Sequence, residues 1–291
     1  MTRISSILLT LDGSPASAKG VGCALWLAQT LGATLHVLHA TMHPTTLEDA
    51  VALLLVPGAQ RAEVVLHQVT GAPHMAVLQR IAEFGVGLVV MSARGESALP
   101  SMPLTRALGG VAQAVIERCP VPVVLLPAHY RESLPWTSML AAGSGEPAAD
   151  QALQAAIQLA AELRLKVNVV HCHASGGETV PVLGGYADAP HHEYSQRLRQ
   201  MIQRGLEGCE SAAGCLGQMV LRQGEPASIL LEEAQRLESS VVALGWHGAF
   251  GAGRAPVLKR LLDEAAFPLL LVREAQRARA RLRVGTDIGG A

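Results

Sequence analysis

Residues 87–95 read GLVVMSARG, an apolar run that ends in a glycine. A loop with two prolines follows, and it leads through a glycine pair at 109–110 to a helical pattern at 111–118. The tetrapeptide CPVP at 119–122 ends that helix, and a second apolar run occupies 123–126. The order strand, glycine loop, helix, strand is that of a parallel sheet, and anions bind where such a loop meets the N-terminus of a helix.

The preceding residues alternate in the same way. Strands are expected at three short apolar runs, which are 4–11, 34–39 and 62–69. Helices are expected in the segments that follow them, which are 16–31, 45–55 and 71–84. Gly32 stands where a helix stop belongs. Strands that alternate with helices in this way predict an α/β fold, with a doubly wound parallel sheet and right-handed crossovers.

The second part of the chain repeats the first. A shift of 132 residues aligns Gly13 with Gly145, and a shift of 153 aligns Gly95 with Gly248. The shift then falls to 146 near the end of the chain, so the second copy has gained 21 residues and later lost seven. Gapless blocks with matching glycines and prolines predict a tandem duplication, and hence two tandem doubly wound parallel five-stranded sheets.

We therefore expect two domains and a tail. The first domain should span residues 1–128 and the second 137–273, with a basic tail at 274–291. The last strand of each domain, at 121–126 and 268–272, should lie at the edge of its sheet. An unpaired apolar edge strand promotes aggregation, so these two strands need a partner.

Composition excludes several classes of protein. Of the 291 residues, 49% are apolar and 16% charged, which is not the composition of a disordered chain. The formal net charge of -1 gives no overall attraction to nucleic acid or to a membrane surface. No apolar run approaches the roughly 20 residues that span a bilayer, and the first residues do not have the pattern of a signal peptide. The five cysteines form no CxxC pair, which predicts free thiols in a reducing cytoplasm.

Two segments resemble the universal stress protein family. ILLTLDGS at 7–14 is similar to the family's opening strand, and residues 94–95, 109–112 and 119–123 are similar to its closing segment. The resemblance covers nearly the whole chain as two copies. It implies an adenine-nucleotide-binding α/β module, with the fold of the adenine nucleotide alpha hydrolases, that serves in stress survival. Because the last strands of this family pair across a two-fold axis, it also implies that the two halves form a pseudo-dimer within one chain.

One branch of the family binds ATP, through a G-x2-G-x9-G-[S/T] loop and an aspartate after the first strand. Asp12 matches that aspartate, and Ala40 stands near the end of the second strand, where the family's backbone contacts adenine. Gly95 matches the first motif glycine. Gly109 and Gly110 match its final two positions, although one residue later than the motif spacing. Bare backbone N–H groups that converge near a helix start are what a phosphate needs.

The match in the first half is incomplete. Ala98 replaces the second glycine, Gly110 lacks the hydroxyl, and two prolines remove backbone donors from the loop. Arg106 offers a phosphate partner, although a lone loop arginine is more often solvated. Asp12 has an alternative interpretation as a turn residue that caps the first helix.

The second half departs further from the pattern. Gly248 and Gly251 keep the G-x2-G spacing, and residues 246–248 resemble the family's Thr-His-Gly. Ser144 replaces the aspartate, and the loop from Gly248 to its end is seven residues long, against 14 in the first half. We expect the second half to be the weaker nucleotide site, or to bind none.

Neither a metal site nor an enzyme is expected. His171 and His173 share one face of a strand, but no further ligand stands at a fixed spacing from them. The chain has no supported Ser/His/Asp set, no recurring carboxylate pair and no Walker lysine. Slow turnover of ATP is possible if nucleotide binds, but the sequence names no catalytic base.

The sequence therefore favours a cytoplasmic tandem universal stress protein, a stress-response binding and signalling module with an ATP or AMP site in its first domain. Mg²⁺ would enter only with ATP. The alternative is an interaction protein that binds no nucleotide and recruits an unknown protein partner through the inserted segment 174–195 or the sheet edges. Neither nucleic acid nor membrane is an expected partner. Pairing of two such chains into a homodimer is a further hypothesis.

Overall fold

The computed structural model describes residues 3–54, 64–95, 108–144, 146–173, 214–251 and 253–274. We call the part from β1 to β5 the first half and the part from β6 to β10 the second half. The elements of the first half are β1 (Ser6–Leu11), α1 (Pro15–Ala18), α2 (Gly20–Leu31), β2 (Thr34–Ala40), α3 (Leu47–Leu53), β3 (Val64–Val69), α4 (Pro73–Glu83), β4 (Leu88–Ser92), α5 (Gly110–Ile116) and β5 (Val123–Leu126). Those of the second half are β6 (Ser138–Gly143), α6 (Pro147–Leu163), β7 (Lys166–His173), β8 (Leu216–Gln223), α8 (Pro226–Arg236), β9 (Val241–Trp246), α9 (Pro256–Glu264) and β10 (Leu269–Arg273).

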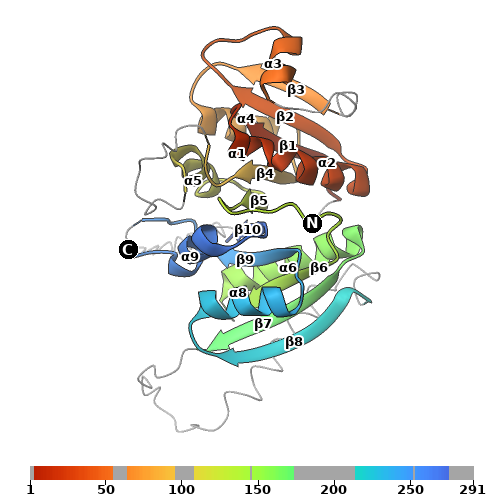
Figure 1. Cartoon of the computed structure of the whole chain (residues 1–291), viewed down its shortest axis with the longest axis vertical. Coiled ribbons are helices and arrows are strands. Elements are labelled where there is room, and N and C mark those ends of the chain that lie inside the picture. The colour runs from red at the N-terminus through yellow and green to blue at the C-terminus, as the bar shows by residue number, and fades with distance from the viewer. Residues whose placement is uncertain are drawn as a thin grey trace, which may run out of the picture.

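The ten strands in the described part of the chain form one sheet, in the order β3-β2-β1-β4-β5-β10-β9-β6-β7-β8 (Figure 1). Within each half the neighbouring strands are parallel, which confirms the predicted doubly wound α/β class. The two predicted five-stranded sheets meet where β5 pairs with β10, and this pair is antiparallel. The halves thus form the expected pseudo-dimer within one chain.

The β5–β10 junction is fully apolar. Leu125 stands opposite Leu269, and Val124 stands opposite Leu270. Each of these four side chains is at most 1% exposed. Because the pairing satisfies the backbone N–H and C=O groups of both edges, it removes the aggregation hazard that two free apolar strands would present.

Helices cover both faces of the sheet. A core of buried residues on one face packs under α2 and α6, and a second core on the other face packs under α4, α5, α8 and α9. Each core includes residues of both halves, so the apolar interior continues across the junction. Within the part of the chain that the structure describes, no helix combines the length and hydropathy needed to span a membrane.

Most predicted helix limits hold within a few residues. Gly32 adopts the left-handed conformation, with φ 63°, and ends α2 as expected. The single helix predicted at 16–31 is wrong in one respect, because the structure breaks it at Lys19 into α1 and α2. The break precedes Gly20, which packs closely against the side chains of Leu9 and Leu126. The inserted segment 174–195 and the tail after residue 274 lie outside the described residues.

The connection between the halves is packed against both. Trp136 of the connection contacts Trp26 of α2, with ring centroids 5.1 Å apart. The backbone N–H of Arg131 donates to the carbonyl oxygen of Ala266 at 2.9 Å, which ties the connection to the second half. A Cβ on Gly22 would overlap the carboxylate of Glu132, so a larger residue on α2 would push that side chain aside.

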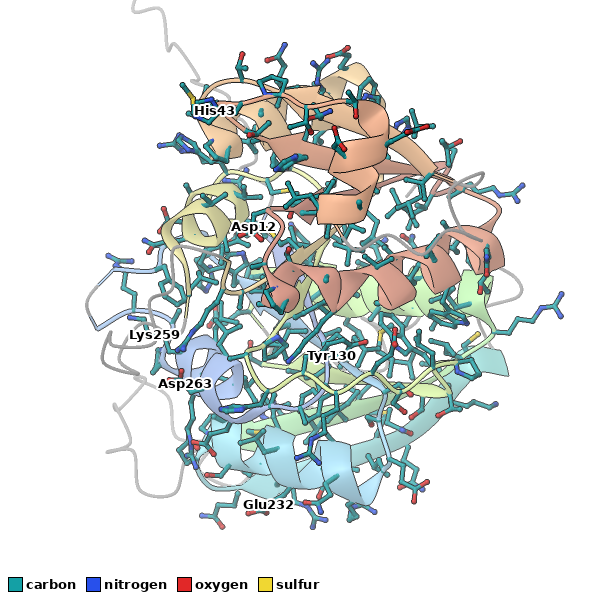
Figure 2. All side chains as sticks on the ribbon, turned by 45° about the horizontal axis from the view of Figure 1, so that its top comes forward. Asp12, His43, Tyr130, Glu232, Lys259 and Asp263 are labelled. Carbon is teal, nitrogen blue, oxygen red and sulfur yellow. The ribbon has the colours of Figure 1, made fainter. Side chains whose placement is uncertain are left out.

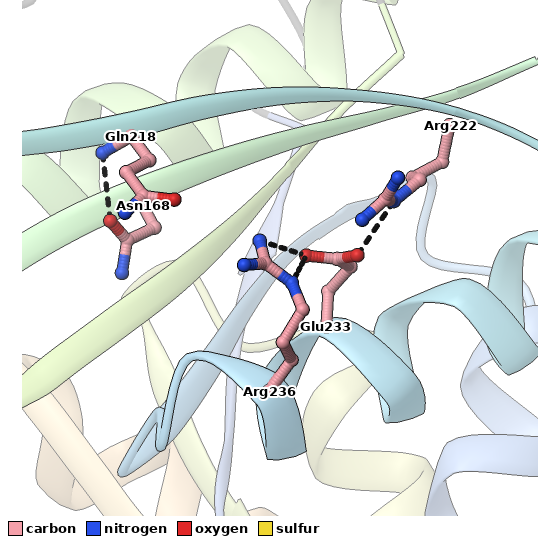
Figure 3. Close-up of polar contacts among 5 residues, drawn as sticks. All are labelled: Asn168, Gln218, Arg222, Glu233 and Arg236. Carbon is pink, nitrogen blue, oxygen red and sulfur yellow. Dashed lines mark hydrogen bonds and ion pairs between the residues drawn. The ribbon is translucent and has the colours of Figure 1, made fainter.

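A buried carboxylate holds the edge strand β8 to α8. Oε1 of Glu233 accepts from Nε of Arg222 on β8 at 2.7 Å, and its Oε2 accepts from Nε and Nη2 of Arg236 at 2.8 and 2.6 Å (Figure 3). These hydrogen bonds, led by those from Arg236, lower the pKa of Glu233. At the other end of β8, Oδ1 of Asn168 accepts from the backbone N–H of Gln218 at 2.8 Å, where the register between β7 and β8 shifts.

Replacement of Glu233 by Gln should destabilise the fold. The variant loses charge-assisted hydrogen bonds from two arginines, which is expected to lower the free energy of unfolding by about 1–3 kcal/mol. Because the pKa of Glu233 is lowered on folding, the difference should be full above its ordinary pKa of 4.5 and shrink as the pH falls through the folded value. Urea unfolding measures this, and Glu232→Gln on the same helix, at an exposed position, is the control. Equal stabilities of the two variants would contradict the prediction.

Two histidines form a cluster near the other sheet edge. Nδ1 of His36 on β2 lies 3.0 Å from Nε2 of His67 on β3, so one of the two nitrogens carries a shared hydrogen. Both rings stack on Phe84 at 4.6 Å, and Arg80 lies over the same ring. Burial lowers the pKa of both histidines, and their mutual repulsion when charged adds to the effect at His67.

The histidine pair should make the first half sensitive to acid. A histidine whose pKa is lowered on folding takes up its proton more readily in the unfolded chain, so stability should fall as the pH drops below the ordinary value of 6.5. Urea unfolding between pH 7.5 and 5 should therefore show a steeper loss for the native protein than for a His36→Gln/His67→Gln variant. His43→Gln, at an exposed position on the same half, serves as the control. Parallel curves would show that the pair does not titrate on unfolding.

Candidate functional site

Three of the predicted site residues stand at the carboxyl ends of adjacent strands. Asp12 follows β1, Ala40 ends β2, and Gly95 follows β4 by three residues. β1 lies between β2 and β4, and the strand order reverses between β1 and β4. In open α/β sheets, ligands bind outside the carboxyl ends of the strands at such a reversal.

The turn after β1 fixes the carboxylate of Asp12. Oδ1 accepts from the backbone N–H of Ser14 at 3.0 Å and from its hydroxyl at 2.6 Å. The hydroxyl oxygen of Ser14 in turn accepts from the N–H of Ser17 at 3.1 Å and caps α1. Asp12 therefore has the turn role that the sequence suggested as its alternative, while Ser14, not Asp12, is the helix cap. The turn holds the carboxylate in one orientation.

The closing segment meets this carboxylate. A Cβ on Gly95 would overlap Oδ2 of Asp12, so a larger residue here would displace the carboxylate from its position. The N–H of Gly109 donates to the carbonyl oxygen of Ala93 at 2.7 Å, which brings the start of α5 beside Gly95. Gly110 is the first residue of α5, and the space around its Cα is open. Asp12 and these three glycines thus come together, whereas Arg106 lies outside the described residues.

The second half keeps the turn after its first strand but not the charge. Oγ of Ser144 accepts from the N–H of Glu146 at 3.3 Å, which repeats the geometry of Asp12 and Ser14. The substitution therefore preserves the hydrogen bond that shapes the turn. It removes the carboxylate that faces the glycine loop in the first half.

α6, the helix that follows this turn, lies closer to the sheet than its counterpart in the first half. Gly245 of β9 packs directly under the backbone of α6, because a Cβ there would overlap the carbonyl oxygen of Ala148. At the equivalent place in the first half, the hydroxyl of Ser92 donates to the carbonyl oxygen of Ala16 at 2.7 Å. A side chain thus separates helix and strand in the first half, and none does so in the second.

The glycine loop of the second half is occupied by contacts within the protein. Gly248, with φ 79°, packs on the side chain of Arg273 and on the backbone of Glu117 from the first half. Nζ of Lys259 donates to the carbonyl oxygen of Gly251 at 2.9 Å and lies 4.9 Å from the ring centroid of Phe250 (Figure 2 labels Lys259). His247, which resembles a family position, has its Nδ1 2.9 Å from a carboxylate oxygen of Glu274.

Two contacts between the halves were not predicted from the sequence. Nη2 of Arg94, beside Gly95, lies 3.7 Å from Oδ1 of Asp263 on α9. The N–H of Phe250 donates to Oε1 of Glu117 at 3.2 Å. The 146-residue shift aligns Glu117 with Asp263 and so marks the two acids as equivalent positions, but it does not identify their partners.

Neither the histidines nor the cysteines form a reactive centre among the described residues. In that part of the chain, no three His, Cys, Asp or Glu side chains gather as metal ligands. Nδ1 of His171 lies 2.8 Å from the carbonyl oxygen of Gly143. Cys23, Cys119 and Cys172 are free thiols, and Cys209 lies outside the described residues. Burial raises the pKa of Cys119 and of Cys172 to about 11, so both are protonated thiols near neutral pH.

Known proteins resemble this chain in sequence and in fold. The model of the Universal stress protein family matches residues 4–62, 46–127 and 136–273. Universal stress protein YxiE of Bacillus subtilis is 25% identical over 147 residues, which cover 47% of this chain and 99% of that protein. A crystal structure of a putative universal stress protein from Pseudomonas aeruginosa has a TM-score of 0.64 at 18% identity, with 93% of each chain covered. One from Archaeoglobus fulgidus has the same TM-score at 16% identity, with 93% of this chain and 97% of that chain covered.

Two glycines of the second half should differ sharply in their tolerance of a methyl group. Gly245→Ala forces α6 off the sheet, and we expect a loss of about 1–3 kcal/mol in the free energy of unfolding. Gly251→Ala places its methyl group in open space at an ordinary φ, so its unfolding curve should match that of the native protein. Urea denaturation compares the two variants. A tolerated Gly245→Ala would mean that α6 does not lie against β9 as described.

Proposed function

Because the chain belongs to the universal stress protein family, we propose that it is a tandem binding and signalling module whose first half binds an adenine nucleotide. The observation that supports this proposal best is the meeting of Asp12, Gly95 and Gly109 at the reversal between β1 and β4. The carboxylate is fixed by its turn, and the adjoining backbone carries no Cβ. That combination suits a polar ligand that approaches the main chain closely.

Each group has a defined part in this proposal. A carboxylate has about four acceptor sites, so Asp12 can hold the Ser14 turn and still accept from ribose hydroxyls. The backbone near Ala40 would face the adenine, and the N–H groups around Gly95 and Gly110 would face phosphate. Mg²⁺ would arrive only as a complex with ATP. Ala98, and the absence of a hydroxyl at Gly110, favour an interaction with fewer phosphate contacts than a complete motif provides.

The proposed role is binding that signals, not catalysis. Among the described residues no general base stands out beside Asp12, and we assign no hydrolytic step. The free thiols among the described cysteines fit a protein of the reducing cytoplasm. The competing proposal is an interaction protein without nucleotide. Its inserted segment 174–195 lies outside the described residues, so the two proposals are separated by the binding measurement.

Isothermal titration of the purified protein with Mg·ATP and with AMP tests the proposal. Asp12→Asn keeps an acceptor for the turn but removes the charge. Its Kd should rise roughly fivefold or more, because a charged acceptor contributes about 1 kcal/mol more than a neutral one. Ser144→Ala removes the equivalent turn acceptor of the second half and should leave the Kd unchanged.

Two results would count against this proposal. Absence of heat and of any shift in melting temperature up to millimolar nucleotide would favour the interaction protein. Equal losses of affinity in Asp12→Asn and Ser144→Ala would show that the site is not confined to the first half.

A further inference from the structure

The last helix of each half, α5 and α9, carries an acidic residue at its C-terminal end; we call these two the closing helices. Glu117 is the cap residue of α5, and Asp263 lies in the last turn of α9. The shift of 146 that aligns Pro122 with Pro268 also aligns these two acids. A helix C-terminus favours cations, so an acid there gains nothing from its own helix. A stabilising partner outside the helix is therefore expected for both.

The partner of Asp263 belongs to the first half. Its carboxylate lies 3.7 Å from Nη2 of Arg94, the residue before Gly95. The side chain of Arg94 is 22% exposed, and its buried Nε has no hydrogen-bond partner among the described residues. Burial raises the pKa of Asp263, and the charge of Arg94 opposes that rise. Figure 2 labels Asp263 on α9 and Asp12 in the first half.

The partner of Glu117 belongs to the second half. Its Oε1 accepts from the backbone N–H of Phe250, which lies in the loop between Gly248 and Gly251. Nε2 of Gln113 donates to the same oxygen at 3.1 Å. In a phosphate-binding loop such a backbone N–H would face the bound anion. Here the carboxylate of the other half takes that hydrogen bond.

These contacts form a reciprocal arrangement around the junction. Each closing helix reaches the glycine loop of the other half, and the junction of β5 with β10 places α5 and α9 on the same face of the sheet (Figure 1). We propose that the halves hold each other's glycine loops. Asp263 is a positioning residue for the first-half loop, which it holds through Arg94. The carboxylate of Glu117 takes the place of a bound anion in the second-half loop. The part of this proposal that concerns nucleotide affinity rests on the function proposed above.

Two consequences follow. The second half contributes to the nucleotide site of the first half although its own loop is shortened. The second-half loop does not accept phosphate while Glu117 occupies it, so the chain has one working site.

Hydrogen exchange of the nucleotide-free protein tests the arrangement directly. Asp263→Asn should speed amide exchange in residues 93–95 and 108–110 at least twofold and leave the melting temperature within error. Glu264→Gln removes the neighbouring charge, which pairs with Arg260, and should change neither segment. Asp263→Glu keeps the carboxylate, so its exchange rates should equal those of the native protein. For the other loop, Glu117→Ala should speed exchange in residues 247–251, whereas Gln113→Ala should not.

Nucleotide affinity provides the second readout. A partly exposed ion pair is weak, so Asp263→Asn should raise the Kd for Mg·ATP by about two- to fivefold, which corresponds to about 0.4–1 kcal/mol. Arg94→Gln should have a similar effect. The double variant should be no weaker than either single variant, because both remove the same interaction.

The outcomes separate this inference from the proposed function. If the native protein binds no nucleotide, the proposed function fails, and exchange alone decides whether the halves hold each other's loops. Unchanged exchange in Asp263→Asn and Glu117→Ala overturns the arrangement. Faster exchange with an unchanged Kd, or additive effects of Arg94→Gln and Asp263→Asn, overturns the positioning role of Asp263.

Discussion

Antiparallel pairing of β5 with β10 is the constraint on which the rest of the molecule depends. The paired residues of both strands are apolar on both faces, so neither half is complete without the other. The pairing satisfies the two inner edges, continues both cores across the junction and leaves β3 and β8 as the outer edges. It also sets α5 and α9 on one face, close to the opposite glycine loops. The contacts of Glu117 and Asp263 are therefore consequences of how the sheet is joined.

The two halves show how a shared fold can separate structure from ligand binding. Asp12 and Ser144 shape the same turn, but only the first carries a charge. Gly95 leaves room for a carboxylate, whereas Gly248 leaves room for an arginine side chain and the backbone of the opposite half. The two glycines thus serve different purposes. The glycine pattern alone does not distinguish a loop that approaches a ligand from one that approaches its own protein.

Local signals explain why the fold could be predicted from the sequence. Apolar runs, glycine stops and the repeated spacing indicated nearly every element, and the edge strands indicated the junction. The break at Lys19 was missed because a helix pattern does not record how closely Gly20 must pack. The meeting of Asp12 with Gly95 could be predicted through family resemblance. Contacts such as Arg94 with Asp263 join residues far apart in the chain, and periodicity carries no information about them.

Joining the two halves in one polypeptide has a consequence for how the molecule can change over time. Separate subunits that pair through such strands would exchange with any related chain in the same cell, and every copy would have to keep both roles. Here the packed connection, with Trp136 against Trp26, holds the second half at a high effective concentration next to one particular first half. Differences between the halves can then be retained in evolution. One half can lose its ligand site and specialise as a support, because it always pairs with the same first half.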